Sequence, residues 1–209
     1  MKLERSFYIR DTIIVAKVLL GCFLVHRTPE GIIKGRIVEV EAYLGPEDKG
    51  AHSYHGRHTP AMDPLYKMGG FAYIFQLHGY NYCFNVVTEK EKTPQAVLIR
   101  GLEPSKGIDL MAKRRNIDLS NGNNFKFKNL TNGPSKLCQA FDISTSINGI
   151  DLCGDELFIT SKKDLDTDEE ILSSPRVNID YAGEYRDKPW RFFLKGNKFV
   201  SRSFKTKIK

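Results

Sequence analysis

A strand-like run that ends in a histidine-bearing loop, residues 36–58, holds the side chains of this sequence best suited to chemistry. Successive side chains of an extended strand point to opposite faces, so one face carries Ile37, Glu39, Glu41 and Tyr43. The other face carries small apolar groups that belong to a core. Carboxylates beside an aromatic ring on a packed strand usually have a partner or a chemical role. A half-exposed edge strand followed by a solvated loop is the structural alternative.

Three roles are open to Glu41: a general base, a metal ligand, or half of a salt bridge. The loop supplies His52, His55 and His58, and imidazoles with a carboxylate suit zinc or iron. Gly56 and the irregular loop give these rings no common face, so we expect no metal site. A metal-dependent hydrolase that uses the three histidines stays open as an alternative.

The composition is that of one globular domain with a basic surplus. The chain has 209 residues, of which 41% are hydrophobic and 27% charged, and this suits a single domain with a substantial core. Its 32 basic and 25 acidic residues give a net charge of +7, which favours a polyanionic partner. Nucleic acid is the leading candidate.

Cysteine usage and the N-terminal region indicate a protein of the cell interior. Cys22, Cys83, Cys138 and Cys153 form no CxxC pair and lie among apolar neighbours, as expected in a reducing compartment. The apolar run within residues 1–25 is interrupted by the charges of Asp11 and Lys17, and its apolar residues have the spacing of an amphipathic helix, so we expect neither a signal peptide nor a membrane span. We therefore expect an intracellular protein, in the cytoplasm or nucleoid if it is bacterial.

Two predicted hairpins position most of these groups. Asp11 is a suitable N-cap for a helix through residue 20. We expect strands at residues 22–26, 32–43, 71–76, 81–88 and 95–101, the first four forming two hairpins. The tip of the second hairpin carries His78 and Tyr80, rings that are large for a turn. These rings either fold back onto the sheet or serve a purpose outside it.

The second half of the chain adds helices and closing strands. Pro104 predicts a helix over residues 105–115, and Pro134 predicts another over 134–140. The remaining predictions are a polar loop at 118–128, strands at 156–160 and 189–194, a charged turn at 162–170 and a frayed basic tail at 201–209. The fold class is therefore α+β: a single compact domain over residues 1–209, mostly antiparallel curved β-sheet with hairpins and flanking helices.

Five separated blocks of the sequence resemble a known enzyme family. They are GRIVEVEAYLGPEDKGAHS, YIFQLHGYNYCFNVV, VLIRGLEP, NGPSKLCQA and RVNIDYAGEYRDKPWRFFLKG. In this order, across roughly residues 8–202, they are similar to the alkyladenine (3-methyladenine) DNA glycosylases of the methylpurine-DNA glycosylase type.

The resemblance implies a monofunctional base-excision repair enzyme that flips alkylated purines out of duplex DNA and hydrolyses the N-glycosidic bond. The implied substrates are 3-methyladenine, with 7-methylguanine, hypoxanthine and ethenoadenine as further candidates. Glu41 would activate the attacking water and Arg100 would help to hold it. It further implies a monomer that acts on damaged double-stranded DNA, without a cofactor, a metal, a membrane or a lyase step. A non-catalytic damaged-DNA-binding protein on the same fold is the alternative.

The resemblance also assigns a base pocket and a wedge. Tyr43, His52 and Phe75 match stacking walls, which would attract electron-poor alkylated bases. Asn85 matches the position that excludes the exocyclic amine of guanine. His78, with Tyr80 sharing the role, would fill the space left by the flipped base. Tyrosine is familiar in the family at the positions of Phe75 and His78, so this sequence departs from the pattern twice.

Overall fold

Strand β2 (Gly31–Tyr43) is the central strand of the sheet, and its two edges are covered by three other strands. One edge pairs with β5 (Gln95–Lys106) along its length. The other pairs first with β1 (Phe23–Thr28) and then, at residues 39–41, with β8 (Arg191–Leu194). The alternative interpretation of this segment as a half-exposed edge strand is therefore wrong, because β2 has partners on both sides.

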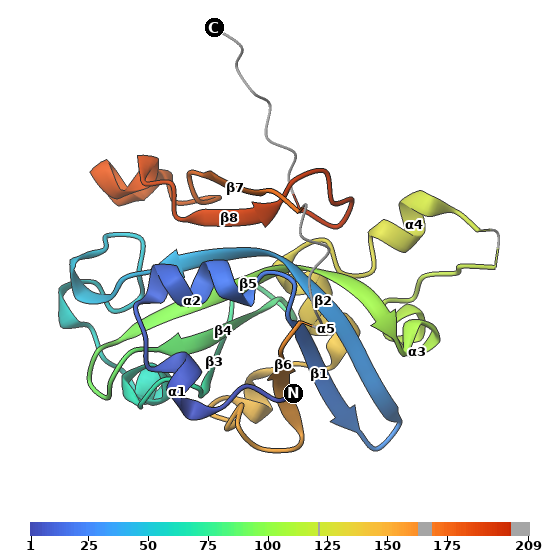
Figure 1. The fold of residues 1–209 in the computed structure, drawn as a ribbon, viewed down its shortest axis with the longest axis horizontal. Helices are drawn as coiled ribbons and strands as arrows, with labels where there is room; N and C mark the ends of the chain where they lie inside the picture. Colours follow the sequence, from blue (N-terminus) through green and yellow to red (C-terminus); the bar gives the residue numbers. More distant parts are fainter. Residues whose placement is uncertain (121, 163–168, 202–209) are drawn as a thin grey trace, which may run out of the picture.

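The computed structural model describes residues 1–120, 122–162 and 169–201, and within them eight strands form one antiparallel sheet in the order β3-β4-β5-β2-β1-β6, with β8 on β2 and β7 on β8 (Figure 1). The remaining strands are β3 (Ala72–Gln76), β4 (Tyr82–Thr88), β6 (Leu157–Thr160) and β7 (Ile171–Ser174). The α-helices are α1 (Arg5–Tyr8), α2 (Thr12–Leu19), α3 (Ile108–Arg114), α4 (Asn124–Lys128) and α5 (Pro134–Phe141). Short 3₁₀ helices are η1 (Gly45–Glu47), η2 (Tyr54–Gly56), η3 (Pro60–Tyr66), η4 (Thr145–Ile147) and η5 (Asp180–Asp187).

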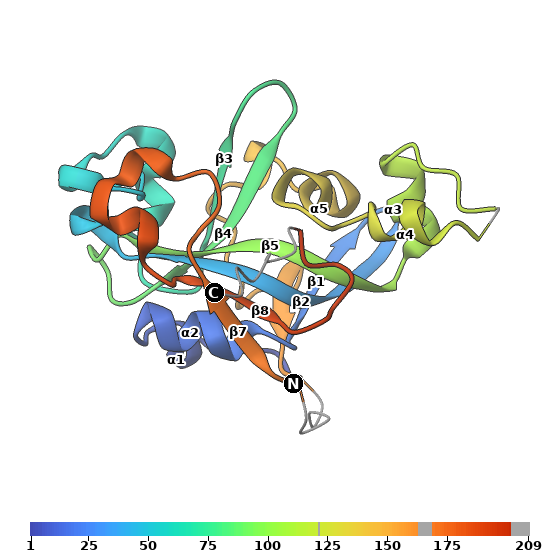
Figure 2. The ribbon, with the colours of Figure 1, turned by 90° about the horizontal axis from the view of Figure 1, so that it is seen from above.

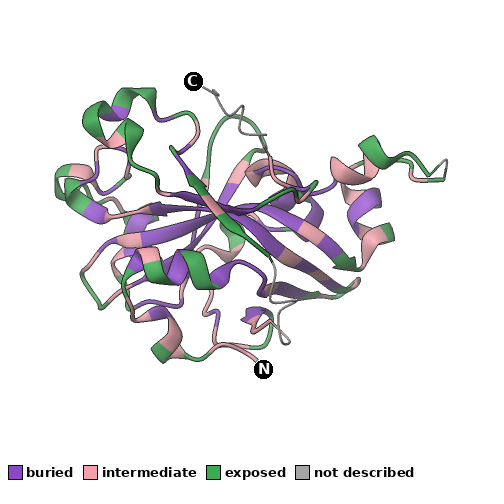
Figure 3. Cartoon of the chain, turned by 45° about the horizontal axis from the view of Figure 1, so that its top comes forward, coloured by how far each residue is buried: buried purple, intermediate pink, exposed green. Residues whose placement is uncertain are grey.

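The sheet curls, and helices cover both of its faces. Helix α2 packs on β2 and β5 from one side, whereas α5 packs on β4 and β5 from the other (Figure 2). The strands between them are buried along most of their length (Figure 3). The predicted α+β class, with a curved antiparallel sheet and flanking helices, is confirmed.

Local signals in the sequence account for several boundaries. The Asp11 carboxylate accepts a hydrogen bond from the Ile14 amide at 2.9 Å, which caps α2 as predicted. Both predicted hairpins, β1–β2 and β3–β4, are present. Pro134 occupies the first turn of α5, where its missing N–H leaves no internal hydrogen bond unmade.

Other boundaries differ from the prediction. Strand β5 runs on through Pro104 to Lys106, so the helix expected from residue 105 begins only at Ile108. Pro104 pairs with Gly35 beside a shift in register, and a proline is tolerated there because the ladder is already interrupted. The predicted loop 118–128 contains the short helix α4, which Asn123 caps. Strand β7 was not predicted.

The predicted tail, 201–209, lies outside the described residues except for Ser201, and so does most of the predicted turn at 162–170. In the part of the chain that the structure describes, no helix combines the length and apolar character needed to cross a membrane.

Candidate active site

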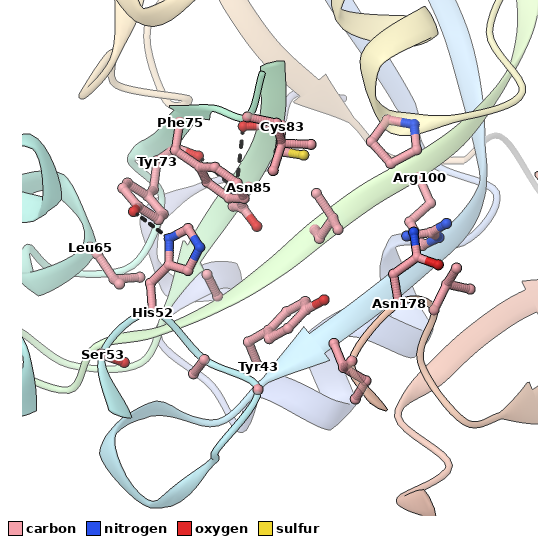
Figure 4. Close-up of a pocket in the computed structure, with 18 of the residues that line it drawn as sticks. Tyr43, His52, Ser53, Leu65, Tyr73, Phe75, Cys83, Asn85, Arg100 and Asn178 are labelled. Carbon is pink, nitrogen blue, oxygen red and sulfur yellow. Dashed lines mark hydrogen bonds between the residues drawn. The ribbon is translucent and has the colours of Figure 1, made fainter. Parts of the chain in front are cut away.

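A cavity of about 320 Å³ opens on the α5 side of the sheet. Its lining comes from β2 to β5, the loop at residues 50–53, the segment 177–181 and the N-terminus of α5. The side chains of Tyr43, His52, Phe75, Asn85 and Arg100 all line it, as predicted for one pocket (Figure 4). The volume is in the range of ordinary small-molecule sites, about 300–1,000 Å³.

Glu41 lies directly behind this lining and has no exposed surface. The Tyr43 hydroxyl donates to Glu41 Oε2 at 2.9 Å, and Arg100 Nη1 donates to the same oxygen at 3.3 Å. The Val177 amide donates to Oε1 at 2.7 Å. A buried carboxylate needs such donors, and three of them hold this one in a single orientation. Burial, together with the adjacent Glu41 carboxylate, raises the pKa of Tyr43 well above its usual value, so its hydroxyl remains a donor.

Arg100 is shared between two carboxylates on the same face of β2. Its Nε donates to Glu39 Oε1 at 3.0 Å while Nη1 contacts Glu41. Glu39 is also fully buried and accepts from Arg191 Nε at 2.7 Å and from the Ser201 amide at 2.6 Å. Burial favours the neutral acid, but the charges of Arg100 and Arg191 and the Ser201 bonds outweigh it and hold the pKa of Glu39 below its usual value. Glu39 therefore fixes the plane of the Arg100 guanidinium.

An aromatic wall faces Tyr43 across the cavity (Figure 4). The His52 and Phe75 ring centroids are 4.2 Å apart, and His52 Nδ1 shares a hydrogen bond with the Tyr73 hydroxyl at 2.9 Å. Burial, and next the charge of Arg57, lower the pKa of His52, so its ring is neutral near pH 7. The predicted wall of His52 and Phe75 thus contains a third ring.

Asn85 lies at the end of this wall. Its side-chain nitrogen donates to the Tyr73 carbonyl at 3.0 Å, which turns its oxygen toward the cavity (Figure 4). Asn85 is 4% exposed, and its side chain cannot swing away without breaking this bond. A fixed polar group therefore borders the space between the walls.

The profile of the methylpurine-DNA glycosylase (MPG) family matches residues 6–198. The chain belongs to this family. A relative from Clostridium acetobutylicum, named "Putative 3-methyladenine DNA glycosylase", is 52% identical over 202 residues, which are 96% of this chain and 98% of the relative. A protein of the same name from Desulfitobacterium hafniense is 48% identical over 201 residues, covering 96% of this chain and 98% of its own length.

These similarities confirm the resemblance drawn from the five sequence blocks. The chain is a DNA glycosylase, a hydrolase of the N-glycosidic bond that serves DNA repair, and DNA is its substrate partner. The cavity combines a buried carboxylate with aromatic walls, which are groups that such chemistry can use.

The β3–β4 hairpin of the glycosylase projects beyond the body of the sheet (Figure 2). The Leu77 amide donates to the Asn81 carbonyl at 2.7 Å and closes the tip. His78 is exposed and Tyr80 is 90% exposed, so neither ring folds back onto the sheet. His78 and Tyr80 therefore stand apart from the cavity, whereas Leu77, beside them, lines it.

The three loop histidines of the glycosylase go to different partners. His52 contacts Tyr73, the His55 ring lies 3.9 Å from that of Tyr54, and His58 Nε2 lies 2.8 Å from Asp63 Oδ1. Among the residues that the structure describes, no three or more of His, Cys, Asp and Glu are grouped to hold a metal ion. The ligand set considered for a metal-dependent hydrolase is thus not assembled.

Sequence reasoning missed some side chains of the glycosylase site. Tyr73 could have been found, because it lies two residues before Phe75 and shares its face of β3. Val177 and Asn178 could not, since they reach the cavity from more than 130 residues beyond Glu41. Asn178 has a φ of 60°, a left-handed conformation that asparagine tolerates better than most residues, and it turns the chain past the cavity.

Proposed function

We propose that this glycosylase flips alkylated purines, above all 3-methyladenine, out of duplex DNA and cleaves them with a water that Glu41 activates. The observation that carries the proposal is the arrangement of Glu41: a wholly buried carboxylate, fixed by Tyr43, Arg100 and Val177, behind a cavity with aromatic walls. The further substrates would be 7-methylguanine, hypoxanthine and ethenoadenine. The protein would act as a monomer inside the cell, where its DNA lies.

In this proposal the water lies between Tyr43 and Arg100. A carboxylate has about four acceptor positions and the three donors to Glu41 fill three of them, so one position stays free to receive the water proton. As the base leaves, positive charge develops on the deoxyribose, and the Glu41 carboxylate stabilises it. Because bulk solvent does not reach Glu41, this attraction is weakly screened.

Two effects would select the damaged base: stacking on the aromatic walls of the cavity and the weakness of its N-glycosidic bond. Alkylation at N3 or N7 makes a purine cationic, which favours stacking on Tyr43 and on the opposite wall and weakens the N-glycosidic bond. Asn85, held by the Tyr73 carbonyl, would crowd the exocyclic amine of guanine. No lysine is among the described lining residues, which supports simple hydrolysis without a Schiff base or strand cleavage.

Single-turnover release of 3-methyladenine and hypoxanthine from defined duplexes, in EDTA, tests the function. Release in excess EDTA supports the proposal. Binding of lesion duplexes without release of either base would identify a damaged-DNA-binding protein instead. Release that appears only when a metal is restored would revive the metal-dependent hydrolase.

The hairpin tip gives a separate prediction. His78→Ala is expected to slow release from duplex DNA by about tenfold and to leave release from single-stranded DNA unchanged, because stacking contacts with bases contribute about 1–3 kcal/mol. His78 is exposed, so the free energy of unfolding should not change. Single-turnover rates on the two substrates measure the effect.

Tyr80→Ala shows whether the neighbouring ring shares this role, since Tyr80 is 90% exposed at the same hairpin tip. An equal loss on duplex and single-stranded DNA in His78→Ala would contradict the wedge. A loss in Tyr80→Ala alone would move the wedge by two residues.

A further inference from the structure

A buried ion pair lies against Tyr43. Arg176 Nη1 and Nη2 donate to Asp48 Oδ2 and Oδ1 at 2.6 and 2.7 Å, and neither side chain has exposed surface. The guanidinium carbon of Arg176 lies 4.5 Å from the centroid of the Tyr43 ring. Tyr43 lines the cavity and Arg176 does not. Arg176 therefore covers one face of the ring, and a flipped base can stack only on the other.

Asp48 is the counter-ion of this guanidinium. Arg176 Nη1 also donates to the Ala42 carbonyl at 3.0 Å, but Nε has no hydrogen-bond partner among the described residues. Asp48 is itself held by the amides of Leu44 and Gly50, at 3.1 and 2.8 Å. Two aligned bonds between carboxylate and guanidinium are the strongest pairing these groups make. Together Asp48 and Arg176 form an electrically neutral unit behind the ring.

The neutrality of the Asp48–Arg176 pair matters because the cavity face of Tyr43 would have to bind a cationic base. An aromatic ring attracts a cation over its face through its quadrupole. Without its counter-ion, the Arg176 guanidinium would make the cation–π interaction on the covered face of Tyr43 and so weaken the one on the cavity face. Its positive charge would also repel a cationic base across the thickness of the ring. The repulsion would be weakly screened, since the pair is wholly buried. A neutral base such as hypoxanthine would not experience it.

We propose that Asp48 is a specificity-determining residue: by neutralising Arg176 behind Tyr43, it allows the cavity face of this ring to accept cationic, alkylated purines. The inference rests on the proposed function of the cavity. In this proposal Asp48 favours cationic over neutral bases, and it does so without contacting the substrate.

The test compares release of 3-methyladenine, which is cationic in DNA, with release of neutral hypoxanthine. Asp48→Asn is expected to lower the ratio of the two single-turnover rates by about fivefold, a typical loss for one cation–π contact. Both rates are measured on one preparation under enzyme excess, so a smaller folded fraction cannot change the ratio. A purely structural role would slow both bases alike.

Arg176→Gln is the opposing variant and keeps the proposal testable if Asp48→Asn does not fold. It leaves the Asp48 charge behind the ring, so the ratio is expected to rise. The double variant Asp48→Asn/Arg176→Gln should return the ratio to the wild-type value. An unchanged ratio in either single variant, or a shift in the same direction in both, would overturn the proposal. Release of neither base by the wild type would instead overturn the proposed function.

Discussion

Glu41→Gln is expected to lower single-turnover base release by about a thousandfold or more while binding of the lesion duplex persists. Glutamine is nearly the same size and keeps an oxygen for the Val177 amide, but it cannot take a proton from water or offer a negative charge to the deoxyribose. Loss of a positioned general base typically costs about 10²–10⁴ in rate, and loss of the charge adds to it. Release of 3-methyladenine and binding of the same duplex are measured in parallel.

The matched control is Glu47→Gln, which removes an exposed carboxylate from the loop that follows β2. This variant should release bases at the wild-type rate, because Glu47 takes no part in the contacts around the cavity. Release by Glu41→Gln within tenfold of the wild type would remove Glu41 from the chemistry. Loss of lesion binding along with release would instead point to a damaged pocket.

Local patterns in the sequence predict those structural features that depend only on residues close together in the chain. Asp11 caps a helix, Gly31 belongs to a tight hairpin, and the alternation on β2 brings Glu39 and Glu41 to one face. The predicted cavity residues also meet, since the family resemblance placed them. The cap, the hairpin and the alternation are each determined within a few residues, whereas the cavity residues were predicted from the family resemblance.

Contacts between distant segments leave no such local sign. Asp48 and Arg176 are 128 residues apart, and nothing near either of them indicates the other. The same holds for Glu39, whose partner Ser201 lies 162 residues away. Pro104 misled the prediction because a proline that usually opens a helix sits here at an irregular point of a strand. The missing information is tertiary in each case.

Glu39→Gln is expected to lower the free energy of unfolding by about 3–5 kcal/mol, the usual cost of removing one partner from a buried ion pair. The substitution leaves the buried guanidiniums of Arg100 and Arg191 without the carboxylate that joins them. Urea unfolding followed by tryptophan fluorescence measures the change. Glu103→Gln is the control, because the Glu103 side chain is 34% exposed and its pairing with Arg36 is long, at 3.5 Å. It should cost no more than about 1 kcal/mol.

The acid dependence of stability separates a lost charge from a packing defect in Glu39→Gln. The pKa of Glu39 is lower in the folded protein than in the unfolded chain, where it is about 4.3. Its contribution is therefore complete above that pH and disappears as the pH falls through the folded value. The gap in unfolding free energy between the wild type and Glu39→Gln should thus narrow as the pH is lowered below about 4. A gap that stays constant down to pH 2 would mean that the charge of Glu39 does not stabilise the fold, and that Arg100 is held in place by packing.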